Sequence, residues 1–206
     1  MEPFDKPLET IQLKRIFLQI GGVIAIAAIL GLFILAYQGT YRTVETLDRR
    51  AGERWVAVTR DLQERYAGIP ELSADLGPSL SPDDPSLTRV SRDLDLWEAA
   101  MSEGTMEDIS RATTDLEESL LSLEEVLEES PSLAASGEAG EFLSALEATG
   151  ERVSADRESY NEGSGEYNRA LGSFPANLWT DNWRFSRREY FTAKIDGEEP
   201  PPVPAD

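Results

Sequence analysis

The most apolar part of the chain lies near its N-terminus. The stretch 16–37, IFLQIGGVIAIAAILGLFILAY, carries no charged side chain and a single strongly polar one, Gln19. At about 1.5 Å per residue, a helix of this length crosses the roughly 30 Å apolar core of a bilayer. A cleavable signal peptide is the alternative, but its apolar region is usually about 7–15 residues long. The pattern therefore predicts an uncleaved transmembrane signal anchor over 16–37, after an N-terminal tail over 1–15.

Apolar and small residues continue after this stretch at spacings of three, four or seven, which places them on one face of a helix. They are Val44, Leu47, Ala51, Trp55, Val58, Leu62, Ile69 and Leu72. Arg65 lies on the same face, and Pro70, which lacks an amide donor, is expected to kink or end this first arm. The next segment, 77–85, holds three prolines and a glycine and is predicted to be a loop.

Two further arms follow from the same kind of spacing. The second arm joins apolar positions over 87–101 to others over 109–127, with a break near Gly104. The third arm follows a loop at 130–140 and runs from Phe142 until Pro175 stops it.

Each arm has to bury its apolar stripe against the others. Residues 38–195 are therefore predicted to form an all-α fold, a long antiparallel helical bundle with three main arms, on the N-terminal transmembrane helix. The segment 196–206 is acidic and Pro-rich, with nothing to bury, and is predicted to be disordered.

The first and third arms carry distinctive motifs. The first arm has Trp55-x-x-Val58-x-x-x-Leu62-x-x-Arg65-Tyr66-x-x-Ile69-Pro70-x-Leu72, and the third has Tyr160-Asn161, Tyr167-Asn168 and Phe174-Pro175-x-Asn177-Leu178. These motifs resemble those of the LemA family of bacterial membrane proteins. The resemblance covers 41–72 and 131–191, whereas 73–115 departs from the family pattern. It implies a helical bundle on a membrane stalk whose molecular activity is not established, and a scaffold or interaction role at the cell envelope.

Composition narrows the chemistry. The chain has 39 Asp and Glu against 19 Lys and Arg, a net charge of -20, so nucleic acid is not an expected partner. It has no cysteine and no histidine, which removes thiol nucleophiles, Cys/His zinc sites and the usual near-neutral base. The paired glutamates at 117–118, 124–125 and 128–129 are interpreted as a solvated helix face. We expect no enzyme activity, no cofactor and no metal.

Eleven residues are candidates for interaction or family-specific contacts: Trp55, Arg65, Pro70, Tyr160, Asn161, Tyr167, Asn168, Phe174, Pro175, Trp179 and Trp183. The two Tyr-Asn pairs are seven residues apart, two helical turns, and imply a repeated contact, either packing between arms or a recognition groove. Arg65 requires a carboxylate or carbonyl partner, with Asp156 or Glu151 as candidates. The C-terminal aromatic residues either cap the bundle core or form a surface for glycan or for the membrane interface.

The predicted function is a membrane-anchored, non-catalytic scaffold or interaction protein of the cell envelope, working with other envelope proteins. The alternatives are an extracytoplasmic ligand-sensing module and a cell-wall-active enzyme. Lys14 and Arg15 abut the N-terminal side of the apolar stretch, which favours a single-pass inner or cytoplasmic membrane protein with its N-terminus inside and its domain outside. A homo-oligomer through the span or the bundle is compatible with small residues such as Gly21 and Ala25.

Overall fold

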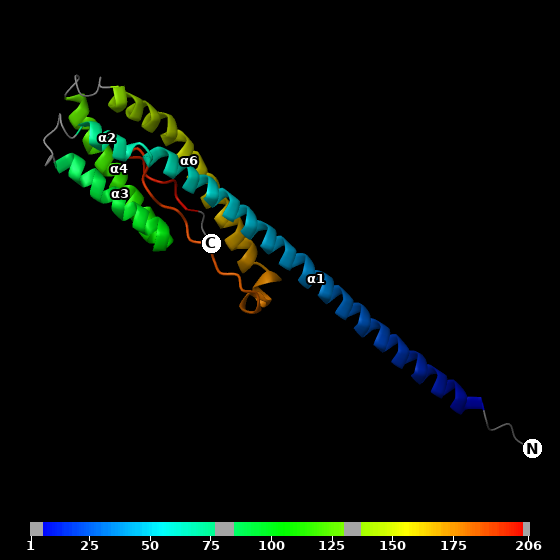
Figure 1. The fold of residues 1–206 in the computed structure, drawn as a ribbon. Helices are drawn as coiled ribbons and strands as arrows, with labels where there is room; N and C mark the ends of the chain where they lie inside the picture. The colour runs from blue at the N-terminus through cyan, green and yellow to red at the C-terminus, as the bar shows by residue number, and fades with distance from the viewer. Residues whose placement is uncertain (1–5, 77–84, 130–136, 204–206) are drawn as a thin grey trace, which may run out of the picture.

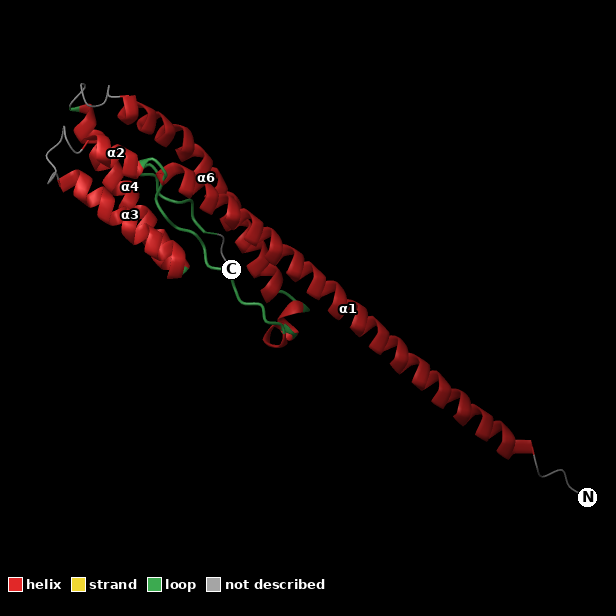
Figure 2. Cartoon of the chain, viewed as in Figure 1, coloured by secondary structure: helices red, strands yellow, loops and turns green. Residues whose placement is uncertain are grey.

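The computed structural model describes residues 6–76, 85–129 and 137–203, with side chains from residue 17 onward in the first range. The helices are α1 (Lys6–Tyr66), α2 (Ile69–Leu76), α3 (Pro85–Glu103), α4 (Met106–Glu128) and α6 (Gly137–Gly172), followed by two 3-10 turns, η1 (Ala176–Leu178) and η2 (Thr180–Asn182). No strand occurs in these ranges, where the remaining segments are turns and extended chain (Figure 2). The all-α prediction is confirmed.

Helix α1 has two halves of opposite character. Its N-terminal half projects from the bundle as a lone helix (Figure 1), and its large apolar side chains are exposed from Phe17 to Leu35. From Val44 onward one face is buried, through Ala51, Val58 and Leu62, and packs chiefly against α6. The apolar stretch is long and apolar enough to cross a membrane.

The first arm breaks where the sequence predicts it. Helix α1 ends at Tyr66, and α2 starts at Ile69 with Pro70 in its first turn, where a missing amide donor costs no helical hydrogen bond. The backbone N–H of Leu72 bonds to the carbonyl of Gly68 at 3.0 Å. The segment 77–84, assigned to a loop, lies outside the described residues.

The break near Gly104 is a reversal of the chain, which the sequence pattern did not specify. Helices α3 and α4 pack side by side (Figure 1), so the second arm is a pair of antiparallel helices. A Cβ at Gly104 would lie 2.6 Å from the carbonyl oxygen of Ala100, so a side chain would collide there. Thr105 then caps α4: its hydroxyl accepts from the Asp108 N–H, and the Asp108 carboxylate accepts from the Thr105 N–H.

Among the residues that the structure describes, the buried apolar side chains form two clusters. The larger one lies among α1, α2, α3, α4 and α6. The smaller one lies at the point where the exposed N-terminal half of α1 joins the bundle. Its members are Val44, Tyr167, Leu171, Ala176, Trp179 and Trp183. Its position means that the 3-10 turns after α6 contribute to the core rather than to an open loop.

After η2 the chain turns back along the bundle as an extended segment, residues 184–195, here named the strap. Figure 2 shows it as a loop running beside the helices. It ends in a turn in which Ile195 and Glu198 form a β-bridge and Asp196 has a positive φ of 52°. The prediction of disorder from residue 196 onward is therefore wrong for 196–198, because this turn binds the bundle through Asp196.

Candidate functional site

The two Tyr-Asn pairs of α6 hold the strap. The Asn161 side chain donates to the carbonyl of Phe191 and accepts from its N–H, both at 2.8 Å. The Asn168 side chain makes the same two bonds to Arg188, both at 2.9 Å. Each amide thus satisfies the backbone of one strap residue, as a neighbouring β-strand would. The strap needs no partner strand.

The sequence spacing explains the register. The Tyr160 and Tyr167 hydroxyls donate to the carbonyls of Glu189 and Ser186, each at 2.9 Å. Seven helical residues rise about 10.5 Å, and three extended residues rise about 10 Å. The seven-residue repeat on α6 therefore meets strap residues three apart, with the strap antiparallel to α6. The repeated contact implied by the spacing is present as packing within the chain.

Helix α4 binds the opposite edge of the strap. The Thr192 N–H donates to the Ser110 hydroxyl and the Lys194 N–H to the Thr114 hydroxyl, both at 3.1 Å. Three strap side chains alternate inward and are fully buried: Phe191, Ala193 and Ile195. Trp55 of α1 packs on two aromatic rings, with ring centroids 5.1 Å from Tyr160 and 5.4 Å from Phe191. The strap is therefore an integral layer between the helices.

A charged cluster closes the C-terminal end of the strap. The Arg65 side chain, 0% exposed, forms a two-point ion pair with Glu117: Nε to Oε1 at 2.8 Å and Nη2 to Oε2 at 2.9 Å. Arg65 also binds the Asp196 carboxylate and the Thr149 hydroxyl. Tyr66 donates to Glu117 at 2.6 Å. A Cβ at Gly150 would overlap the Asp196 carboxylate, so glycine lets the turn approach α6.

Two sequence expectations are wrong at this cluster. Arg65 was expected to pair with Asp156 or Glu151, but it pairs with Glu117 and Asp196, because α4 and the C-terminal turn face this part of α1. Glu117 was assigned to a solvated face, yet it is 1% exposed. Its neighbour Glu118 is exposed, as expected.

The electrostatics of the cluster favour the charged form of Arg65 and the neutral form of Tyr66. Burial alone would lower the pKa of Arg65, but the hydrogen bonds and charge of Glu117 outweigh it and raise that pKa. Burial raises the pKa of Tyr66, and the charge of Glu117 adds to the effect. The pKa of Asp196 is raised by burial despite the opposing charge of Arg65. This arrangement holds a proton on Tyr66 and a full charge on Arg65.

The other end of the strap joins an aromatic group, residues 174–183, here named the foot. Trp179 lies 5.5 Å from the Phe33 ring and 5.1 Å from the Tyr37 ring. Trp183 packs on Tyr37 at 5.6 Å, and its indole N–H donates to the Tyr37 hydroxyl at 2.9 Å. Trp179 and Trp183 are buried and close the small cluster, while Phe174, joined by a cis peptide bond to Pro175, is 79% exposed.

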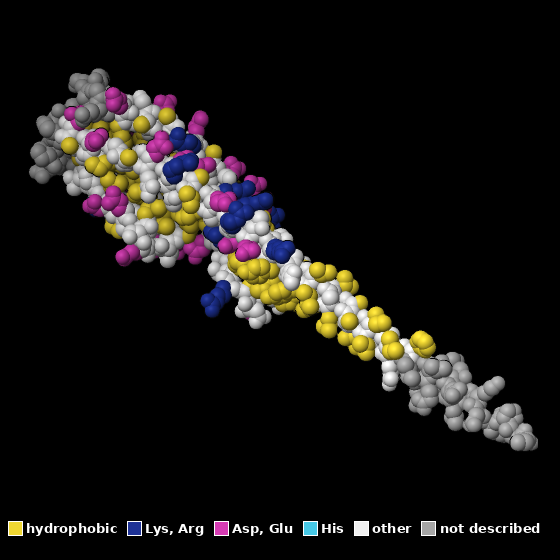
Figure 3. Space-filling view, turned by 45° about the vertical axis from the view of Figure 1, so that its right-hand side comes forward, with side chains coloured by type: hydrophobic (Ala, Val, Ile, Leu, Met, Phe, Trp, Pro, Cys, Tyr) yellow, Lys and Arg dark blue, Asp and Glu magenta, His cyan; other side chains and the backbone are white. Residues whose placement is uncertain are grey.

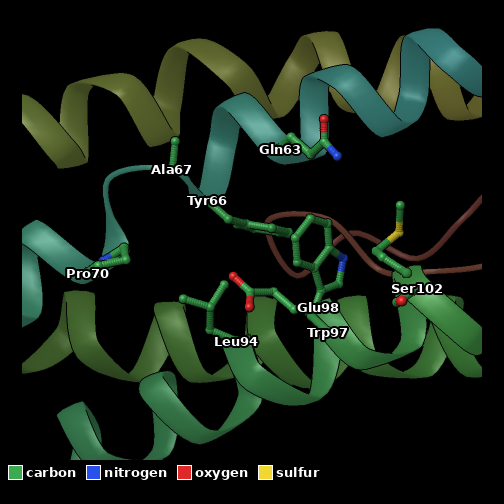
Figure 4. Close-up of a pocket in the computed structure, with 9 residues that line it drawn as sticks. Gln63, Tyr66, Ala67, Pro70, Leu94, Trp97, Glu98 and Ser102 are labelled. Carbon is green, nitrogen blue, oxygen red and sulfur yellow. The ribbon is translucent and has the colours of Figure 1, made fainter.

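A groove of about 460 Å³ opens between α1, α2 and α3 (Figure 4). It is lined by Gln63, Tyr66, Ala67, Pro70, Leu94, Trp97, Glu98, Met101 and Ser102. The Tyr66 and Trp97 rings meet edge to face at 4.9 Å and form its floor. The buried indole N–H of Trp97 has no hydrogen-bond partner among the described residues. The groove is therefore apolar at its base, with Gln63 and Glu98 as polar groups at its margin.

The candidate residues fall into three places. Trp55 and the two Tyr-Asn pairs contact the strap. Arg65 is the centre of the charged cluster, and Pro70 lines the groove. The other candidates, Phe174, Pro175, Trp179 and Trp183, belong to the foot. The sequence did not identify Glu117 or the strap. In the described part of the chain, no group of three or more Asp or Glu residues could hold a metal ion.

The chain matches a family of known proteins. Residues 54–204 match the family model described as the LemA family. The matched range holds the charged cluster, the Tyr-Asn pairs, the foot and the strap, and it starts after the apolar stretch. No curated protein matches the chain.

Proposed function

The chain belongs to the LemA family, and from this premise we propose that it is a membrane-anchored, non-catalytic scaffold that presents a rigid helical bundle to other proteins of the cell envelope. The observation that carries the proposal is the continuity of α1. One helix, Lys6–Tyr66, holds the exposed apolar stretch and the buried stripe of the bundle.

The exposed half of α1 supports the anchor. Val23, Ile29 and Leu35 are each about two-thirds exposed, and their neighbours are similar. Each large apolar side chain left in water forgoes about 1.5–3 kcal/mol of transfer free energy. A contiguous apolar surface of this size is typical of a membrane or protein contact. Its length and the absence of charge over 16–37 favour the bilayer.

The bundle supports a scaffold rather than an enzyme. Several of its buried polar groups hold elements together: Asn161 and Asn168 bind the strap, and Glu117 binds Arg65. These residues have a structural role. The outer faces of α3 and α4 are not used in these contacts and can bind partners. Figure 3 shows Asp and Glu spread over the bundle beside a group of Lys and Arg. The net charge of the chain, -20, suits partners with basic patches.

Topology is the first test. Ser144 lies exposed on α6, and the chain has no natural cysteine. In the Ser144→Cys variant, a membrane-impermeant maleimide should label intact cells as fully as lysed cells, with the protein retained in membranes after alkaline carbonate washing. Label restricted to lysed cells would place the domain inside. Release of the protein by carbonate would overturn the anchor.

The scaffold role is tested by in-cell crosslinking. A photo-crosslinking amino acid is placed at Leu96, an exposed apolar residue of α3, in the otherwise unchanged protein. It should crosslink the protein to one discrete envelope protein. A matched probe at Val56 on α1 serves as the control for non-specific capture. Equal, diffuse capture at both positions would argue against a scaffold with a defined binding face.

A ligand-sensing module is a second candidate, favoured by the groove lined by Tyr66 and Trp97. The two aromatic rings offer a surface on which an apolar or aromatic ligand could pack. A thermal-shift screen with small-molecule fragments tests this: hits should stabilise the native protein and not the Leu94→Trp variant, whose larger side chain fills the groove.

A further inference from the structure

We propose that the foot, residues 174–183, is a second membrane contact that inserts into the bilayer interface beside α1. The inference rests on the anchor proposed above and adds a lipid-binding surface that lies more than 130 residues away from the span in the sequence. Its basis is the depth, exposure and chemistry of the foot.

The contacts of the foot fix its depth. Phe33 and Tyr37 belong to the apolar stretch 16–37, and Trp179 touches both rings, with centroids 5.5 and 5.1 Å apart. Any bilayer that surrounds the apolar stretch must therefore reach Trp179 as well. Figure 1 shows the foot beside α1, at the end of the bundle that faces the projecting half of the helix. The foot cannot be in bulk water while Phe33 is in lipid.

Two exposed side chains of the foot are large and apolar: Phe174 is 79% exposed and Leu178 is 58% exposed. The foot also exposes Asn177, Asp181 and Asn182, and Asp181 is the one charged residue within 174–183. Figure 3 shows apolar side chains gathered where the bundle meets the projecting half of α1. Two large apolar side chains held outward by a folded turn are suited to the boundary between headgroups and acyl chains.

The residues around the foot match the rest of an interface. Tyr37, Tyr41, Trp179 and Trp183 form a continuous ring contact, and Trp and Tyr are favoured at headgroup depth. Arg42 and Arg184 are exposed directly beyond this group, where a guanidinium can reach phosphates. In a chain with a net charge of -20, basic residues at this level lessen repulsion from an anionic leaflet.

One consequence is orientation. A single helix can rotate about its own axis in a membrane, but a foot that inserts on one side of α1 holds one face of the bundle toward the lipid. The groove and the outer face of α3 then keep a constant direction relative to the membrane surface.

Site-directed spin labelling of the full chain in phosphatidylcholine/phosphatidylglycerol nanodiscs tests the inference. Labels go on Phe174→Cys and Leu178→Cys, with Ile26→Cys as the span control and Val56→Cys, 64% exposed on the bundle, as the water control. Collision rates with oxygen report lipid, and those with a water-soluble nickel chelate report solvent. The foot labels should show an oxygen-to-nickel ratio several-fold above that of Val56 and below that of Ile26, as expected for the interface.

The outcomes separate the two proposals. A water-like Ile26 label would overturn the anchor itself. A lipid-like Ile26 label with foot labels that match Val56 would overturn the foot insertion alone. Strong spin-spin broadening at Leu178 between copies, with low oxygen collision, would assign the surface to a second copy of the chain and would also overturn it.

Discussion

At one end of the strap the C-terminal segment meets α1 through buried charge, and at the other end it meets α1 through aromatic rings. The charged cluster joins Arg65 to Glu117 and Asp196, whereas the foot joins Trp179 and Trp183 to Tyr37. Both ends lock distant parts of the chain together. They differ in what happens when one partner is removed, because an unpaired buried charge is far costlier than a missing ring contact.

The type of contact at each end of the strap also matches the polarity of its surroundings. Around Arg65, backbone and hydroxyl groups of α6 complete the coordination of the guanidinium, as Thr149 does. Beside the apolar stretch such polar groups would be costly, and a single hydrogen bond, from Trp183 to Tyr37, suffices for the rings. The chain therefore uses ionic locking where the bundle is thick and aromatic packing where it becomes a single helix.

The sharpest test of the comparison is Glu117→Ala. It leaves Arg65 buried with only the half-exposed Asp196 as a carboxylate, and we expect a loss of about 3–5 kcal/mol in the free energy of unfolding. Urea unfolding of the detergent-solubilised protein, followed by far-UV circular dichroism, measures it. Glu118→Ala, one residue away and exposed, should change stability by less than about 0.5 kcal/mol. Equal losses would mean that the buried pair is not the lock.

Between the two ends, Asn161→Ala should cost about 2–3 kcal/mol. It removes both hydrogen bonds to Phe191 and leaves a buried backbone N–H and carbonyl unsatisfied. The same unfolding assay measures the loss, with the exposed Asn182→Ala as the matched control. A native-like stability for Asn161→Ala would show that the strap is held by its apolar side chains alone.

Alkaline pH should weaken the strap contacts of α6. Burial raises the pKa of Tyr167 to about 12, above its ordinary value near 10. Because the folded state holds the proton more tightly, this contribution is complete below pH 10 and is lost as pH rises from 10 to 12, by up to about 2 kcal/mol. Stability measured across this range should fall less steeply in Tyr167→Phe. An unchanged slope would contradict the assignment.

The smallest effect is expected at the foot. Trp183→Phe keeps a ring but removes the N–H bond to Tyr37, and a loss of about 1 kcal/mol is expected. A double-mutant cycle with Tyr37→Phe measures the coupling energy of the pair. A coupling as large as the Glu117 effect would erase the distinction between the two ends.

Much of the helical layout could be predicted from spacing. The stripe from Val44 to Leu62, the break at Pro70 and the break at Gly104 are all present in the structure. The direction of the chain after Gly104 could not be predicted, because periodicity identifies a helix face but says nothing about which helix it meets. The same gap explains the misassigned partners of Arg65.

The sequence does contain a signal that Glu117 is buried, but a competing pattern obscured it. It lies four residues after Thr113 and three before Leu120, both buried, so its position belongs to the inner face of α4. Its place in a run of glutamates favoured a solvated interpretation. The strap had no such signal, since an extended segment bound by side chains of Asn161 and Asn168 needs no strand pattern of its own.

The unbroken course of α1 also sets a length scale. From Tyr37 to Tyr66 the helix rises about 44 Å. In the membrane-anchored state that we propose, this part of the helix is a lever arm that pivots at the bilayer. A change of about 20° in tilt, an ordinary value for a membrane helix, would sweep the outer end sideways by about 15 Å. The reach of the bundle, and hence the radius within which it can capture a neighbour, is governed by the angle of this one helix.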